Sequence, residues 1–276
     1  MFLILFFRTN VVYNVKFFFG FYVKQFLIIF INLSKVQFDA SAPKPTHLVG
    51  KTIRLALPMA GSRLIQMLSG FIGMLMLARL GHTVLAASAL MTPTMITIIV
   101  IMIALLFSVS VVVGQAWGAG KQYEIGSIIQ QGCVLALIIS IPAMILFWYV
   151  DRFLLWTGQP PELIVYVRQY FHALEWGVVP IMLGATIQQA CYGMLKQRLV
   201  IILNSFCLLI FVGVSYILIF GKLGFKDYGV AGLSYAFSIQ AWLNLILLLV
   251  IFYVLPELKP MQLFAKRDGS ASFLLM

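Results

Sequence analysis

The sequence predicts an all-α membrane protein, a bundle of six transmembrane helices. Its 276 residues are 62% hydrophobic and only 10% charged, whereas charged residues make up about a quarter of a soluble domain. Long apolar runs alternate with short polar loops. A helix rises about 1.5 Å per residue and the hydrocarbon core is about 30 Å thick, so about 20 apolar residues cross it. Lipid offers backbone groups no hydrogen bonds, so such runs must be helices that pack together.

The first three spans have recognisable starts and ends. We expect the first helix to begin near Leu57-Pro58, since proline is tolerated in a first turn. Its glycines Gly70 and Gly73 would allow a neighbouring backbone to approach closely. The second span contains Pro93 and leads into a glycine-rich turn, and the third contains Pro142 and ends at an aromatic interface. The three runs cover about residues 53–78, 84–114 and 125–150.

The last three spans are separated by turns of similar kind. The fourth follows Pro160-Pro161 and contains Glu175, Pro180, Gln188 and Gln189. The fifth opens after the basic turn 196–198, and the sixth starts at the glycine-rich segment 229–232 and ends at Pro256. These runs cover about residues 164–192, 199–220 and 229–255.

The segments that flank the bundle differ from it in composition. Residues 1–45 form a phenylalanine-rich extension and linker that arginine and lysine interrupt, so no clean span exists there. A signal peptide, a basic amphipathic surface helix and an extension outside the functional bundle, from a misplaced start site, are all compatible with it. The bundle itself is expected over 46–256, followed by a short basic cytoplasmic tail over 257–276.

The formal net charge of +11 is explained by membrane topology. Lysines and arginines are scattered through the loops and are more frequent on the side that precedes the first span, which predicts that both ends are cytoplasmic. No clustered basic surface indicates a nucleic-acid partner. Cys133, Cys191 and Cys207 lie within spans without metal-ligand spacing, so we expect neither disulfide nor metal.

The order of motifs resembles the multidrug and toxic compound extrusion (MATE) family, cation-coupled exporters of drugs and organic cations. The similarity covers about residues 50–255. It is carried by the segments 55–58 through Gln66, Gly70-Phe71, 78–81, 85–87, 114–120, 193–198, 216–224 and 229–232. Family members have two six-helix lobes that face each other across a central cleft. The resemblance therefore implies that this chain supplies the first lobe.

Several positions depart from the family pattern. The family's first helix carries an aspartate that binds the coupling proton or sodium, and Gly73 stands at that position. Two asparagines of the fifth helix precede the tyrosine that matches Tyr216, and Phe211 and Ser215 stand there instead. The resemblance implies H⁺ or Na⁺ as coupling ion and no other cofactor.

The remaining polar residues of the spans are the site candidates. An ionisable residue at membrane depth costs about 2.5–3.5 kcal/mol on insertion scales and indicates function by default. Glu175 is the candidate coupling or cation site; pairing with Arg168 is the alternative. Arg63 is expected to extend toward the headgroups. Candidate cleft-lining residues are Gln66, Gln188, Gln189, Asn204, Ser215 and Tyr216, and interhelical hydrogen bonding is the alternative for the amides and the serine.

The leading hypothesis is a MATE-type antiporter lobe in the bacterial inner membrane, with amphipathic or cationic small molecules as substrates. Homodimerisation or a separate chain would supply the second lobe. Two other hypotheses stay open: an inactive fragment of a broken transporter gene, and a flippase of lipid-linked precursors. A flippase would favour a cleft rich in arginines, whereas the spans offer chiefly Arg63 and Arg168. No nucleophile or metal constellation indicates an enzyme.

Overall fold

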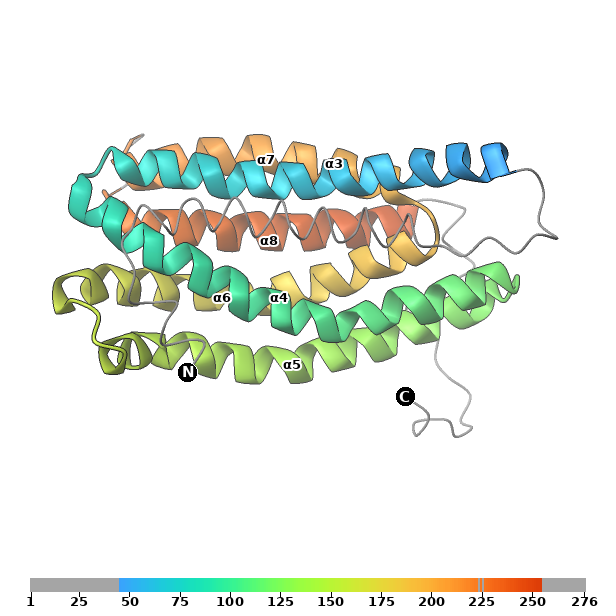
Figure 1. Ribbon diagram of the computed structural model, residues 1–276, viewed down its shortest axis with the longest axis horizontal. Coiled ribbons are helices and arrows are strands. Elements are labelled where there is room, and N and C mark those ends of the chain that lie inside the picture. Colours follow the sequence, from blue (N-terminus) through green and yellow to red (C-terminus); the bar gives the residue numbers. More distant parts are fainter. Residues whose placement is uncertain (1–44, 223, 225, 255–276) are drawn as a thin grey trace.

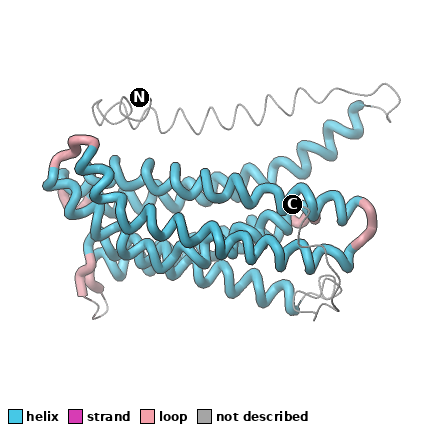
Figure 2. Tube along the Cα trace, turned by 90° about the horizontal axis from the view of Figure 1, so that it is seen from below, coloured by secondary structure: helices cyan, strands magenta, loops and turns pink. Residues whose placement is uncertain are grey.

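Six long helices make up the part of the fold that the structure describes, as the sequence predicts. A computed structural model describes residues 45–222, 224 and 226–254, and these residues contain no strand. The helices lie side by side along the long axis of the molecule (Figure 1) and their loops gather at its two ends (Figure 2). They are α3 (Pro45–Ala78), α4 (His82–Gly118), α5 (Gln122–Trp156), α6 (Pro161–Gly193), α7 (Gln197–Phe220) and α8 (Gly229–Val254).

Most helices extend beyond the apolar runs that predict them. The first helix begins at Pro45, so the lead-in 46–54 is helical and Pro58 lies inside the helix, not in its first turn. Helix α4 likewise includes the glycine-rich segment up to Gly118. Hydropathy marks only the part of a helix that lipid surrounds, whereas the hydrogen-bonded backbone continues into the polar ends. The predicted extension up to residue 44 and the tail after Val254 lie outside the described residues.

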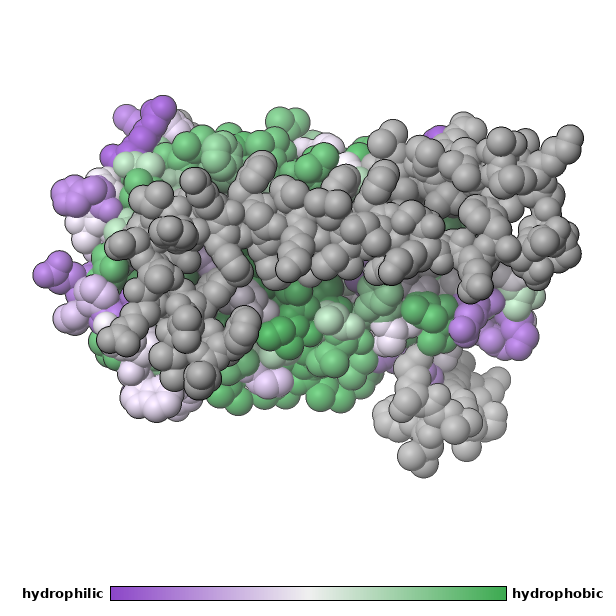
Figure 3. Space-filling view, in the orientation of Figure 1, coloured by the Kyte–Doolittle hydropathy of each residue, from purple (hydrophilic) through white to green (hydrophobic). Residues whose placement is uncertain are grey.

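Five helices of the described chain are long and apolar enough to cross a membrane, namely α4, α5, α7, α8 and the Ala60–Ala78 part of α3. Helix α6 is not among them, because charged and amide side chains interrupt its sequence. The visible face of the molecule shows hydrophobic residues along the bundle and hydrophilic ones at both ends (Figure 3). This distribution is that of a membrane-embedded bundle.

Helix α6 holds the bundle together. It packs extensively against α8, α4 and α5, whereas α7 joins α8 to α3. The contact between α3 and α4 is smaller and that between α3 and α8 is slight. Helix α4 crosses the bundle obliquely, from the end of α3 to the start of α5 (Figure 1). Helix α6, which carries Glu175 and two adjacent glutamines, is therefore the helix that its neighbours cover best.

Glycines let the helix backbones approach closely, but not at the predicted positions. A Cβ atom added at Gly193 would lie 2.6 Å from the carbonyl oxygen of Ser110, and one at Gly232 would lie 2.7 Å from that of Leu218. Nothing lies within 4 Å of a Cβ added at Gly70. The close approaches thus lie between α6 and α4 and between α8 and α7. The prediction for Gly70 is wrong, because this position does not face a neighbouring helix.

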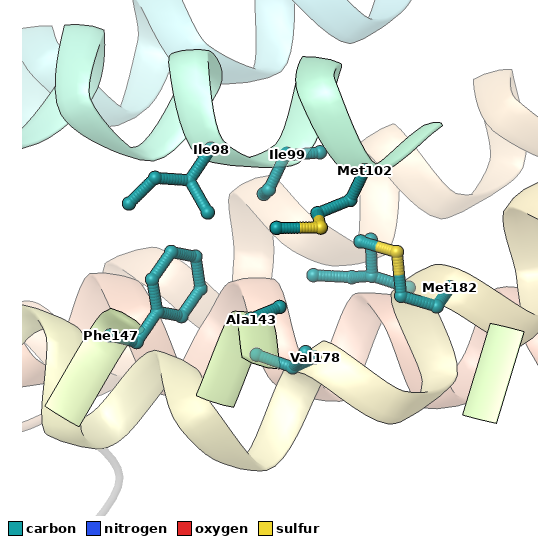
Figure 4. A pocket seen from close by; sticks show the side chains of 8 residues that line it. Ile98, Ile99, Met102, Ala143, Phe147, Val178 and Met182 are labelled. Atoms are coloured by element: carbon teal, nitrogen blue, oxygen red, sulfur yellow. The ribbon is translucent and has the colours of Figure 1, made fainter. Parts of the chain in front are cut away.

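Apolar side chains fill the space between α4, α5 and α6. One hollow there is lined by Ile98, Ile99, Met102, Ala143, Phe147, Val178, Ile181 and Met182 (Figure 4). It admits no water molecule and no lining residue carries an oxygen or nitrogen in its side chain. This part of the bundle is packed core. Polar side chains between helices lie at other interfaces of the bundle.

Candidate functional site

The seam between α6 and α8 is closed by hydrogen bonds to the backbone of α6. Proline has no N–H, so Pro180 leaves the carbonyl of Trp176 without its usual helical donor. The indole Nε1–H of Trp242 on α8 donates to this carbonyl oxygen at 3.3 Å. One turn earlier, the Ser238 hydroxyl lies 3.3 Å from the carbonyl oxygen of Ala173 and 3.0 Å from that of Ser234 in its own helix. Trp242 of α8 therefore satisfies the carbonyl that the proline leaves without a donor.

A chain of side-chain amides links α6, α8 and α7. The Nε2 of Gln188 donates to Oδ1 of Asn244 at 2.9 Å, and the Nδ2 of Asn244 donates to Oδ1 of Asn204 at 3.1 Å. Asn204 is buried, and its own Nδ2 has no partner among the described residues. The structure thus brings together two of the predicted cleft residues, Gln188 and Asn204, through a third amide.

That third amide, Asn244, is the residue that the sequence analysis missed. It lies in an apolar run of the sixth span, between Leu243 and Leu245. The only sequence signal for its role is that it is an asparagine, because an amide at membrane depth needs a hydrogen-bonding partner. Thus the sequence can show that such a residue needs a partner, but not which helix supplies it.

Glu175 stands apart from this amide chain. It lies near the middle of α6 and is half-buried, with no ion pair or hydrogen bond to any described residue. The alternative pairing with Arg168 is wrong, since the Nε of Arg168 lies 3.8 Å from Oδ2 of Asp151 on α5. Thirteen residues separate Glu175 from Gln188, which is about 20 Å along a helix. The carboxylate and the amides do not form one constellation.

Gly73, where the family pattern has its aspartate, is buried against α8. A Cβ atom added there would lie 2.9 Å from Cδ1 of Leu233. Leu233 therefore takes part of the space into which a side chain at this position would extend. No described acidic residue replaces the missing carboxylate at this contact.

Two buried hydroxyls share one level of the interface between α7 and α8. Neither Ser215 Oγ nor Ser234 Oγ has a partner among the described residues. Contacts on both sides of the two serines place them at this level. On one side the ring centroids of Phe211 and Phe237 are 4.5 Å apart, and on the other side Gly232 packs on Leu218. Ser234 is also the chain neighbour of Leu233, which packs on Gly73. The predicted residue Ser215 thus points into the bundle.

Two further candidates, Gln66 and Tyr216, are exposed, whereas Gln189 is buried. The Oε1 of Gln66 accepts a hydrogen bond from Nη1 of Arg63 at 3.1 Å, one turn away on α3. Tyr216 lines an open groove between α3 and α7, and its ring centroid lies 5.3 Å from that of Phe220. These two side chains are accessible at the surface of the lobe, whereas Asn204 and Ser215 are buried inside it.

Comparison with known proteins decides the family. The MatE family model matches residues 58–217, which is more than half of the chain. The chain belongs to the MatE family. Membership accounts for the all-helical bundle.

Curated MatE relatives are about twice as long as the matching region. A protein of Synechocystis sp. named "Probable multidrug resistance protein NorM" is 31% identical over 198 residues, covering 72% of this chain and 43% of its own. The "Multidrug resistance protein NorM" of Aliivibrio fischeri is 26% identical, covering 78% of this chain and 46% of its own. This chain thus spans about half the length of the curated relatives it matches.

Solved MATE structures share the fold of this half. The eukaryotic MATE transporter AtDTX14 superposes with a TM-score of 0.72 at 18% identity, over 78% of this chain and 47% of that one. A multidrug resistance MATE family transporter in an outward-facing conformation gives a TM-score of 0.69 at 20% identity, over 80% and 48%. The six helices correspond to one lobe of such a structure.

Proposed function

We propose that this chain acts as one lobe of a secondary active transporter that exports cationic or amphipathic small molecules, in exchange for H⁺ or Na⁺. The observation that carries the proposal is the match of the MatE family model to residues 58–217, which extend from α3 into α7. In two-lobe transporters, one repeat moves against the other around a site near the bilayer midplane. A homodimer or a separate chain would supply the opposing lobe.

Glu175 is the proposed coupling group. Gly73 offers no side chain to bind a cation. Glu175 is a carboxylate near the middle of α6, and no lysine or arginine among the described residues forms an ion pair with it. Its partial exposure would let a proton or cation reach it. A charged group kept at this depth despite its insertion cost supports a functional role.

Polar residues of α3, α6 and α7 would line the substrate path. Gln66 and Tyr216 present exposed polar groups on α3 and α7. Gln188, Asn204 and Ser215 lie deeper in the bundle. They would contact the substrate when the helices that cover them move apart. Aromatic and amide groups suit organic cations, because a ring face attracts a cation and an amide oxygen accepts its hydrogen bonds. We further propose that the lobe lies in the bacterial inner membrane with both ends cytoplasmic.

Tolerance assays in a drug-sensitive host test the proposal. The chain is expressed alone and together with the second half of the Synechocystis relative, and growth is scored on cationic dyes. Export is expected to raise tolerance in at least one of these arrangements. No rise in either, at confirmed membrane expression, would overturn the transport proposal.

A matched pair of variants tests the role of Glu175. Glu175→Gln should abolish the rise in tolerance, whereas Glu162→Gln, at the exposed start of the same helix, should keep it. Equal tolerance in the two variants would exclude Glu175 as the coupling site and leave export itself standing.

A further inference from the structure

Two parallel apolar ridges run along one side of the bundle. On α3, exposed residues recur every three or four positions, which places them on one face of the helix: Leu64, Leu68, Phe71 and Leu75. On α7, Ile202, Phe206 and Leu209 follow the same spacing, and Tyr216 lies seven residues, or about two turns, further along the same face. The α3 ridge continues four residues further, to Arg79, so an apolar strip ends in a cation.

The two ridges flank a groove, because α3 and α7 are packed neighbours that run in the same direction. Gly61 lies against Ile201 toward one end of this pair. Toward the other end the groove has a volume of about 290 Å³ and is lined by Ile72, Leu75, Met76, Arg79, Tyr216 and Phe220. From Leu64 to Arg79 the α3 ridge measures about 22 Å at the rise of a helix. The groove itself lies at this end and is apolar except for Arg79 and the hydroxyl of Tyr216, and the two ridges extend from it along the bundle.

Positive charge gathers at that end. The described residues of the α3–α4 and α7–α8 turns carry three cations, Arg79, Lys222 and Lys226, against the single carboxylate of Asp227. The turns are close, since a Cβ atom added at Gly229 would lie 4.0 Å from Leu80. Arg79 makes no ion pair with a described residue. In Figure 3, hydrophilic residues appear at this end beside hydrophobic surface.

We propose that this groove is a binding site for a phospholipid with an anionic headgroup. An acyl chain would lie between the α3 and α7 ridges, and the phosphate would meet Arg79, whose planar guanidinium can donate two parallel hydrogen bonds to it. Tyr216 lies one turn before the end of α7, the level at which aromatic residues meet headgroups. Basic pockets between transmembrane helices bind anionic headgroups on the cytoplasmic side of membranes, and the same contacts would act here at the outer end of the bundle, where the proposed topology places Arg79.

The charge distribution favours a lipid over a second copy of the chain. Two copies that met through this face around an axis along the membrane normal would bring both Arg79 side chains, with their neighbouring lysines, to one level. Like charges placed together oppose association. An anionic lipid neutralises the same charges. The site shares Tyr216 with the substrate path proposed above, but binding of a lipid there does not require the chain to transport.

Native mass spectrometry of the purified chain tests the site. The protein is released from nanodiscs that contain equal amounts of phosphatidylglycerol and phosphatidylcholine, and the bound lipids are counted. The wild type should retain phosphatidylglycerol in preference, and Arg79→Gln should lower that preference about fivefold, the effect of one cation at a membrane surface. Leu75→Trp, which fills the groove, should lower retention of both lipids.

Arg152→Gln is the matched control. Arg152 lies at the same end of the bundle, on α5, where its guanidinium carbon is 5.2 Å from the Tyr149 ring centroid. Helix α5 packs on α4 and α6, away from the groove, so this variant should keep the preference.

Three results would overturn the proposal. The first is equal retention of the two lipids by the wild type or an unchanged preference in Arg79→Gln. The second is displacement of the lipid by inorganic phosphate, which would show a simple anion site. The third is a disulfide between two Phe71→Cys chains in the bilayer, which would show that a second copy covers the groove.

Discussion

The indole of Trp242 donates a hydrogen bond to the carbonyl oxygen of Trp176 that Pro180 leaves free. A proline inside a helix removes one donor and exposes one acceptor, and lipid cannot satisfy that acceptor. The side chain of a neighbouring helix does so here. Pro180 of α6 and Trp242 of α8 are thus structurally linked, because the indole supplies the donor that the proline lacks.

Trp242→Phe should therefore destabilise the bundle. The substitution keeps an aromatic ring but removes the donor, so the Trp176 carbonyl loses its hydrogen bond. We expect a loss of about 0.6–2 kcal/mol, the range for hydrogen bonds between membrane helices. Thermal unfolding in detergent measures it, and Trp156→Phe, at an exposed position at the end of α5, is the control.

Pro180→Ala should change the outcome of that experiment. Alanine restores an N–H that can donate to the Trp176 carbonyl, so Trp242→Phe should cost less in this background. A double-mutant cycle isolates the difference. If Trp242→Phe costs the same with and without Pro180, the proposed link between the two residues is wrong.

Asn244→Leu should cost more than the loss of a single contact. It removes the amide that bridges Gln188 and Asn204, and both are left with unpaired polar atoms inside the bundle. We expect a loss of about 1–3 kcal/mol, the cost of an unsatisfied buried group. Gln169→Leu, at an exposed position on α6, should have little effect. Equal unfolding temperatures in the two variants would show that the amide chain does not stabilise the lobe.

Gly193→Ala and Gly213→Ala should have opposite effects. A methyl group at Gly193 would meet the backbone of α4, which cannot rotate away, so we expect a loss of about 1–3 kcal/mol from overpacking. Gly213 has open space around it, so alanine there should stabilise α7 by about 0.5–1 kcal/mol through helix propensity. Unfolding temperatures compare the two. A stabilised Gly193→Ala variant would contradict the close α6–α4 contact.

Gly73→Asp should be coupled to Leu233. The new side chain meets only the end of the leucine, which can be shortened. Leu233→Ala alone leaves a cavity and costs about 2–5 kcal/mol. In the double variant the aspartate occupies that space, so the combined loss should be smaller than the sum of the two. Additive losses would show that Leu233 does not fill the position of the family's aspartate.

Hydropathy predicts the helices of this chain well and their ends less well. The apolar run 84–114 marks α4, but the helix continues to Gly118 because its last turns are polar and still hydrogen-bonded. The lead-in before Pro58 shows the same limit. A proline can begin a helix or lie within it, and the local sequence does not distinguish the two.

The contacts of the candidate site could be predicted only in part. Residue type identifies Gln188, Asn204 and Glu175 as costly in lipid, but the partner of each depends on which helices are neighbours. Arg168 pairs with Asp151 of α5, although Glu175 is its closer neighbour in sequence. The bridge through Asn244 depends likewise on the packing of α8 between α6 and α7. Pairing between helices is a property of the assembled bundle.

The central position of α6 has a consequence for how the lobe is made. This helix combines charged and amide side chains with the broadest contact to other helices. On its own it would partition into lipid poorly, because each central charge opposes insertion. Helices α4 and α5 precede it in synthesis and offer a protein surface to receive it, and α8 completes that surface last. We expect the nascent α6 to remain at the translocon until α8 has been made. The order in which the helices are synthesised would then also be the order in which they assemble.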